Sequence, residues 1–215
     1  MMIDYAAKLN QQALLHILAG AARLTGLHYT VFSWGGSCFL VSCQDQVTSY
    51  LRSIVNGDAK LMMVEFGSTS PQWMERANET IAPLLKPLIN ALTPSDTLPS
   101  RTAPAIPLID LDTLDTLLMP TLNGLLLGYP VVYYVTTAEE SQKAAMALSS
   151  ESLTLFRVLS GETILSSFSV PSHLIPGGGD HPLWASIANW ADKMMSAQED
   201  ARFEHKEVGL VFVSL

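Results

Sequence analysis

LDTLLMPTLNGLLLGYPVVYYVT, residues 114–136, is the stretch that decides the fold class. Its first part predicts a helix over residues 114–127 with a kink at Pro120, because proline lacks the amide that a helix interior needs. Gly128 ends this helix. Residues 130–136 are β-branched and aromatic, and they form the strongest predicted strand of the chain. A helix that passes directly into a strand is the repeating unit of α/β folds.

Upstream of this stretch, helical and strand patterns alternate. Gly35-Gly36 predicts a hairpin turn, while Ser70 as N-cap and Pro71 in the first turn predict the start of a helix. Pro83 and Pro87 predict a kink or break within that helix. The predicted elements are helix 4–24, strands 27–34 and 37–42, helix 44–55, strand 60–66 (apolar on both faces and therefore central), helix 71–92 and edge strand 108–111.

Downstream, the patterns predict a further hairpin and a long helix. Residues 138–147 are weakly helical or loop, and Ser160-Gly161 joins two strands, 152–159 and 162–170. Asp180 is expected to cap the next helix. That helix covers residues 181–203, and a last apolar strand covers residues 208–215.

Together these elements predict one α/β domain over residues 1–215. Early alternation of helices and strands, with antiparallel hairpins early and late, indicates a mixed parallel/antiparallel sheet flanked by helices. A length of 215 residues suits a single domain. The proline-rich segment at 93–107 is expected to be a surface loop rather than a domain boundary.

Composition excludes several classes of partner. Apolar residues make up 48% and charged residues 15% of the chain, which suits a buried core. The formal charge is −8 and no basic cluster occurs, so nucleic acid and anionic membranes are disfavoured partners. Residues 13–22 are apolar, but they suit an amphipathic first helix better than a signal peptide. No stretch reaches the ~20 apolar residues of a membrane span.

Cys38 and Cys43 are the two cysteines of the chain. Their odd spacing within a strand places them on opposite faces, which argues against a disulfide. We therefore expect free thiols and a cytoplasmic setting. Cys43 precedes a helix N-terminus, which can activate a thiol, but a buried, inert thiol is the default.

The glycine-rich loop at 176–180 invites a phosphate-binding interpretation, because amides at a helix N-terminus can bind anions. Neither the Walker nor the Rossmann pattern is present, so we expect a plain loop and no cofactor. His173 and His181 flank the loop as candidates for a catalytic base. Their spacing matches no metal signature, so no metal site is predicted.

Carboxylates near strand ends are the other catalytic candidates. Glu65 and Asp110 end predicted strands, where α/β sheets usually bind ligands, and Ser68 lies in the loop after Glu65 as a candidate binding residue. Asp112 is instead expected to cap a helix. Tyr129 and Trp184 are candidate anchors for a partner, although core packing is the preferred interpretation of the helical tryptophans.

Two stretches, GLLLGYPVVYY at 124–134 and ILSSFSVPSHL at 164–174, are distinctive. With Pro176 and the apolar C-terminal residues, they resemble uncharacterised protein family 0739, the family of the human chromosome 1 open reading frame 74 protein. The resemblance covers residues 123–215 well and residues 27–66 more weakly, and an early strand and helix of the family have no counterpart here. It implies one domain and an acidic residue at the position of Glu65. It implies no activity and no cofactor.

Two functions are therefore expected. The first is a non-catalytic cytosolic module for protein interaction or scaffolding, because no coherent catalytic constellation is present. The second is an enzyme that processes a small molecule or nucleotide. Its site would lie at strand ends, with Glu65 and Asp110 near the 67–70 loop and with His173 or His181.

Overall fold

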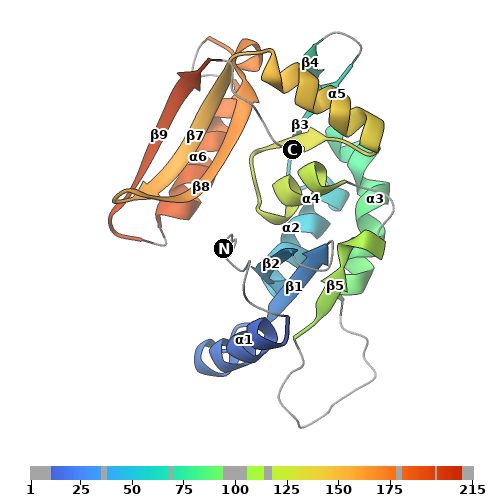
Figure 1. Ribbon diagram of the computed structural model, residues 1–215, viewed down its shortest axis with the longest axis vertical. Helices are drawn as coiled ribbons and strands as arrows, with labels where there is room; N and C mark the ends of the chain where they lie inside the picture. Colours follow the sequence, from blue (N-terminus) through green and yellow to red (C-terminus); the bar gives the residue numbers. More distant parts are fainter. Residues whose placement is uncertain are drawn as a thin grey trace. The chain divides into compact units, whose positions relative to one another are not determined.

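The structure is a computed structural model that describes residues 11–34, 38–67, 70–93, 106–113, 118–177, 181–196 and 198–209. In this part of the chain, six α-helices accompany three sheets of three strands each. Two sheets mix parallel and antiparallel pairs, and the third is antiparallel. The predicted α/β class with mixed pairing is thus confirmed, although the strands are divided among three sheets (Figure 1).

The chain forms two compact units. Unit 1 comprises Met1–Lys60 and Asn78–Thr116, and unit 2 comprises Leu61–Ala77 and Leu117–Leu215. The prediction of a single domain over residues 1–215 stays a prediction. Most of the proline-rich loop, residues 94–105, lies outside the described residues.

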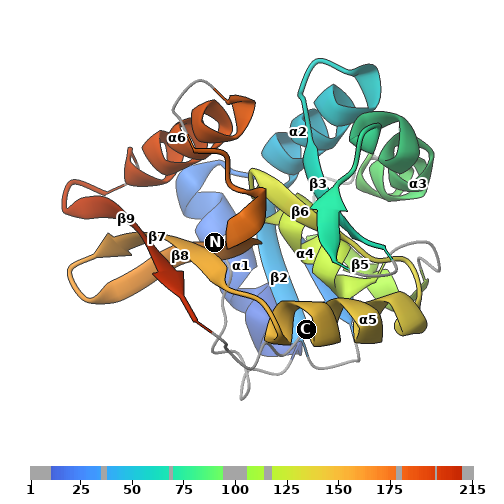
Figure 2. The same cartoon turned by 90° about the horizontal axis from the view of Figure 1, so that it is seen from above.

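In unit 1, a small mixed sheet has the order β2-β1-β5. Leu14 and Leu18 of the first helix pack against Val31 and Val41 of this sheet. Helices α2 and α3 lie side by side (Figure 2). The elements are α1 (Gln11–Thr25), β1 (Tyr29–Trp34), β2 (Cys38–Cys43), α2 (Gln44–Asn56), α3 (Ala77–Leu92), β5 (Leu108–Asp110) and the 3-10 turn η1 (Leu111–Thr113).

The start of α3 corrects the sequence-based prediction. Pro71 does not open a helix capped by Ser70; it begins β4 (Pro71–Trp73), and α3 starts at Ala77. Proline is tolerated there because β4 is an edge strand. The helix also runs unbroken through Pro83 and Pro87. Both prolines lie on its exposed face, so water can solvate the carbonyls that lose a backbone partner.

The first sheet of unit 2 has the order β4-β3-β6, with β3 (Met62–Phe66) central as predicted. Strand β6 (Val131–Tyr134) runs parallel to β3 and carries α4 (Met119–Leu126) on one side. Pro120 lies in the first turn of α4 and not at a kink within a longer helix, because α4 begins only at Met119. Helix α5 (Ala138–Ser149) contacts β3 and β4.

The second sheet of unit 2 is antiparallel, with the order β8-β7-β9, and α6 (Pro182–Met195) packs on it (Figure 1). Its core is aromatic: the Phe156 and Phe168 rings stack at 5.0 Å, and Trp190 meets Phe168 edge-on at 4.9 Å. The strands are β7 (Leu153–Ser160), β8 (Thr163–Pro171) and β9 (Ala201–Val208), and the 3-10 turn η2 (Ser172–Leu174) follows β8.

The end of the chain differs from the prediction. Helix α6 ends at Met195 rather than at residue 203, and the last described strand is β9. Strand β9 pairs with β7 along its whole length, yet its sequence, ARFEHKEV, is polar and lacks the apolar run on which the prediction relied. Residues 210–215, most of the predicted last strand, lie outside the described residues.

Candidate functional site

A hollow of about 480 Å³ lies in unit 1, along the outer face of α2 and beside the end of α3. We call it the α2 groove. Of its lining side chains, that of Leu92 alone is apolar. The volume lies within the range of small-molecule sites.

The periodicity of α2 explains why one of its faces is polar. Asp45, Ser49, Arg52 and Asn56 are spaced four, three and four residues apart, so they share a face. The buried face is formed by Val47, Leu51 and Ile54. The helix thus anchors itself in the core and presents a continuous polar surface to the groove.

Arg52 is the cation of the groove. Its Nη2 donates to Thr93 Oγ1 at 3.0 Å, and this hydroxyl donates to the Ile89 carbonyl at 2.8 Å. No carboxylate pairs with Arg52 in the described part of the chain. The guanidinium is therefore held in place while most of its five N–H donors stay available.

Two further side chains shape the wall of the groove. The Gln44 amide donates to the Leu92 carbonyl at 2.7 Å and so ties α2 to the end of α3. The Thr48 hydroxyl is buried and has no hydrogen-bond partner among the described residues.

Asp45 and Asp58 supply the negative charges of the groove. Asp45 lies 3.6 Å from His28, with Oδ2 facing Nδ1. Asp58 follows Gly57, whose φ of 81° ends α2 in the left-handed conformation that glycine adopts most easily. Asp58 has no ion pair among the described residues.

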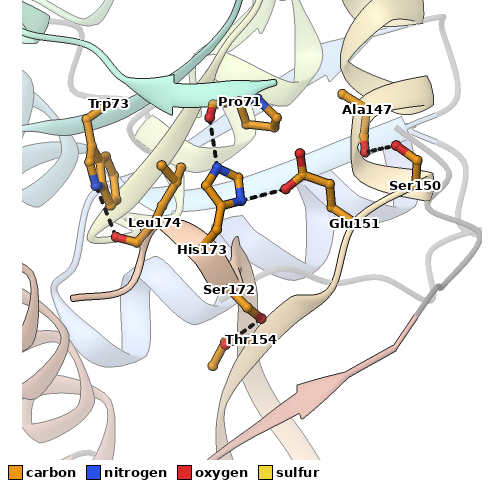
Figure 3. A network of polar contacts seen from close by, with 9 residues as sticks. All are labelled: Pro71, Trp73, Ala147, Ser150, Glu151, Thr154, Ser172, His173 and Leu174. Carbon is orange, nitrogen blue, oxygen red and sulfur yellow. Dashed lines mark hydrogen bonds and ion pairs between the residues drawn. The ribbon is translucent and has the colours of Figure 1, made fainter. Parts of the chain in front are cut away.

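In unit 2, His173 lies between two acceptors (Figure 3). Its Nδ1 is 2.6 Å from Glu151 Oε2, and its Nε2 is 3.0 Å from the Pro71 carbonyl. A carbonyl only accepts, so the ring donates from Nε2 to Pro71. The arrangement joins β4, η2 and the start of β7.

Neighbouring contacts support the same junction. Trp73 Nε1 donates to the Leu174 carbonyl at 3.1 Å, and the hydroxyls of Thr154 and Ser172 lie 3.0 Å apart (Figure 3). His173 is thus embedded in a set of contacts that attach η2 to the edge of β4.

Glu65 lies on β3 beside Tyr134 of the parallel strand β6, near the carboxyl ends of both strands. Its Oε1 accepts from Gln72 Nε2 at 3.1 Å. Burial raises the pKa of Tyr134, and the charges of Glu140 and Glu65 raise it further. Glu140 accepts from the Thr136 amide, which lowers its pKa. Glu65 contacts Gln72 and His173 contacts Pro71, and these two partners are adjacent residues of β4. The other ring nitrogen of His173 faces Glu151 and not Glu65.

The other two catalytic candidates hold local structure. Asp110 belongs to unit 1, and its Oδ1 accepts from the Asp112 amide at 3.1 Å at the start of η1. His181 is the N-cap of α6, where its Nδ1 accepts from the Leu183 amide at 3.2 Å. The cap is therefore His181 and not Asp180, because the ring nitrogen accepts from Leu183, whose amide is the first N–H of a helix that begins with Pro182.

The candidate binding residues also have clear places. Tyr129 packs against Phe168, and Trp184 packs against Phe156 within the aromatic core of unit 2. Core packing, the preferred interpretation of the helical tryptophans, is confirmed for Trp184 and Trp190. Ser68 lies outside the described residues.

The α2 groove was missed by the sequence analysis, although a signal for it exists. Arg52 stands on the polar face of a strongly amphipathic helix among hydroxyl and amide side chains. Nothing local indicates that Thr93, some forty residues later, would hold its guanidinium. That partnership depends on how α2 and α3 pack.

The described residues form neither a metal-binding cluster nor a membrane-spanning helix. No group of three or more His, Cys, Asp and Glu side chains could hold a metal ion in this part of the chain. No described helix has the length and apolar character needed to cross a bilayer.

Comparison with known proteins identifies a family. A family model described as "Domain of unknown function (DUF4504)" matches residues 1–210. No curated protein and no solved structure matches the chain. The expectation of an uncharacterised family is thus confirmed by a match over nearly the whole chain.

Proposed function

The chain belongs to the DUF4504 family, a family of unknown function, and we propose that it binds a small molecule through a carboxylate group in the α2 groove. The observation that carries this proposal is Arg52, which Thr93 holds at 3.0 Å and which lacks an acidic partner among the described residues. A guanidinium presents a planar fork of donors that matches a carboxylate.

The walls of the groove support a hydrophilic ligand. Apart from Leu92, the described lining side chains carry hydroxyl, amide, carboxylate or guanidinium groups, so a ligand with polar groups can form hydrogen bonds along the groove. This proposal keeps the small-molecule class expected from the sequence but moves the site away from Glu65, Asp110 and the histidines.

Thermal unfolding with a panel of small carboxylates tests the proposal. A ligand present at about ten times its Kd stabilises the folded state by ~1.4 kcal/mol, which raises the Tm of a chain this long by about 3–6 °C. We expect at least one hydroxylated or amino-bearing carboxylate to do so. The Arg52→Gln variant should bind the same ligand about 10–100-fold more weakly, because a charged hydrogen bond contributes ~1.5–3 kcal/mol.

Arg202→Gln is the matched control, since Arg202 is an exposed arginine on β9 in unit 2. It should bind like the wild type. The proposal fails if no carboxylate stabilises the wild type, or if Arg52→Gln and Arg202→Gln bind equally well.

Interaction with another protein chain is a second candidate function, which the edge strand β8 supports. None of its residues Thr163–Pro171 is charged, and Ile164 and Leu165 are 49% and 37% exposed. The opposite edge, β9, carries several charges. Charged edges resist association, whereas an uncharged apolar edge invites it. A second copy of this chain suits β8, because two identical uncharged strands meet without like-charge repulsion.

Sedimentation velocity over a range of protein concentrations tests this second function. We expect a concentration-dependent dimer for the wild type and a monomer for Leu165→Lys. Lys206→Leu, on the charged edge, is a control that should leave the dimer intact. A wild type that stays monomeric throughout, or a Leu165→Lys variant that dimerises equally well, would reject it.

We also propose a cellular location, an absence of nucleic acid partners and a wider family kinship for this protein. A cytoplasmic location is supported by the free thiol of Cys43, and the absence of nucleic acid partners by the formal charge of −8. Kinship with uncharacterised protein family 0739 is supported by the stretches at 124–134 and 164–174.

A further inference from the structure

The α2 groove contains two charges without an ion-pair partner in the described part of the chain, Arg52 and Asp58. We infer that its ligand is a small zwitterion of the free amino-acid class, with its carboxylate on Arg52 and its ammonium group on Asp58. This inference rests on the proposed function and adds the second charge and the ligand class. It is carried by the position of Asp58, the opposite charges of Arg52 and Asp58, and the volume of the groove.

The turn that carries Asp58 is fixed by four hydrogen bonds. The Gly57 amide donates to the Ile54 carbonyl at 3.1 Å, and the Ala59 amide donates to the Ser53 carbonyl at 3.0 Å. The side-chain amide of Asn78 donates to the carbonyls of Ile54 at 2.9 Å and Ala59 at 2.7 Å. The backbone on both sides of Asp58 is therefore held against the last turn of α2.

Arg52 lies six residues before Asp58 and is held by a side-chain hydrogen bond. Its bond to Thr93 ties the guanidinium to the end of α3. The hydrogen bond of Arg52 and the fixed backbone around Asp58 limit the motion of both residues before a ligand arrives, which reduces the entropy lost on binding. Four residues of helix, such as 52 to 56, advance by about 6 Å, so a molecule with opposite charges a few ångströms apart can contact both groups.

The opposite charges of Arg52 and Asp58 favour a zwitterion over an anion or a cation. Asp45, the third charged residue that lines the groove among the described residues, faces His28 at 3.6 Å. Arg52 and Asp58 have no ion-pair partner among the described residues. A simple anion would be repelled by Asp58 and a simple cation by Arg52, while a zwitterion satisfies both.

The other lining residues set the character of the ligand's side chain. Ser49, Ser53 and Asn56 occupy the same face of α2 as Arg52, and they offer hydroxyl and amide groups. A volume of about 480 Å³ is ample for one amino acid with a polar side chain. We therefore expect polar amino acids to bind more tightly than aliphatic ones of similar size.

Binding of free amino acids and their blocked derivatives tests the inference. Each standard amino acid is titrated into the full-length chain by calorimetry, and the tightest binder is then compared with its N-acetyl and its carboxamide derivatives. We expect each blocked form to bind about tenfold more weakly or worse, because each loses one charged contact. The Asp58→Asn variant should lose a similar factor for the free amino acid but bind the N-acetyl form as the wild type does.

The outcomes separate this inference from the proposed function. If the N-acetyl form binds as well as the parent, or Asp58→Asn has no effect, the zwitterion is rejected while a carboxylate site at Arg52 stands. If no amino acid binds but another carboxylate binds in an Arg52-dependent way, the ligand class alone is wrong. If nothing that binds depends on Arg52, both proposals fail. Asp192→Asn on α6 is the matched control and should bind like the wild type.

Discussion

Thr121 joins α4 to β6 through a single buried hydroxyl. Its Oγ1 lies 2.9 Å from the carbonyls of both Tyr133 and Val135 and accepts from the Val135 amide at 2.8 Å. The side chain is fully buried. This one residue therefore bonds backbone groups in the last residues of β6 and just beyond its end.

We expect Thr121→Val to lower the free energy of unfolding by ~1–3 kcal/mol, because the change keeps the shape of the side chain but leaves buried backbone groups unpaired. Urea denaturation measures the effect. Thr163→Val, at the exposed start of β8, should change stability by less than ~0.5 kcal/mol. Equal effects for the two variants would contradict this role of Thr121.

Two buried phenols predict how stability depends on alkaline pH. Burial raises the pKa of Tyr50 and of Tyr133 from 10.0 to about 12. The pKa values are raised in the folded state only. The two neutral phenols therefore contribute fully to the free energy of unfolding below pH 10, and this contribution is lost as the pH rises towards 12. Stability should therefore fall across this window, and the fall should be shallower in Tyr50→Phe and in Tyr133→Phe. An equally steep fall in both variants would contradict the assignment.

At the scale of elements, local sequence predicts the strands whose hydrophobic pattern is strong. The central strand β3, the strand β6 and the β7–β8 hairpin follow from apolar or alternating patterns and a turn glycine, and Gly161 indeed has a φ of 57°. The misplaced elements depend on pairing with another strand rather than on a strong pattern of their own. Strand β4 is three residues long and is held by β3, and β9 is polar but paired along β7.

The packing of α4 on β6 depends on Gly124. A Cβ built on Gly124 would lie 3.0 Å from both methyl carbons of Val132. We expect Gly124→Ala to destabilise the protein by about 1–3 kcal/mol through overpacking, despite the better helix propensity of alanine. The double variant with Val132→Ala should be more stable than the sum of the single effects predicts, since the smaller side chain vacates the space. Strict additivity in thermal unfolding would show that the two residues do not compete for space.

At the scale of the whole molecule, the candidate site shows where inference from sequence ends. The strand-end position of Glu65 was predictable, because it follows from the order of elements. The structural tasks of His173 and His181 were not, since each depends on a backbone group that the fold brings into reach. The α2 groove likewise exists because α2 and α3 pack together, and the sequence pattern does not predict that packing.

The central claim is that ligand binding occurs in the α2 groove and depends on Arg52. Backbone amide NMR spectra, recorded during titration with the tightest-binding carboxylate, locate the site directly. We predict that the shifted resonances cluster at residues 44–58 and at Leu92 and Thr93, and that the shifts disappear in Arg52→Gln. Shifts that cluster instead around Glu65 and residues 134–140, and persist in Arg52→Gln, would contradict the account and place the site at the strand ends.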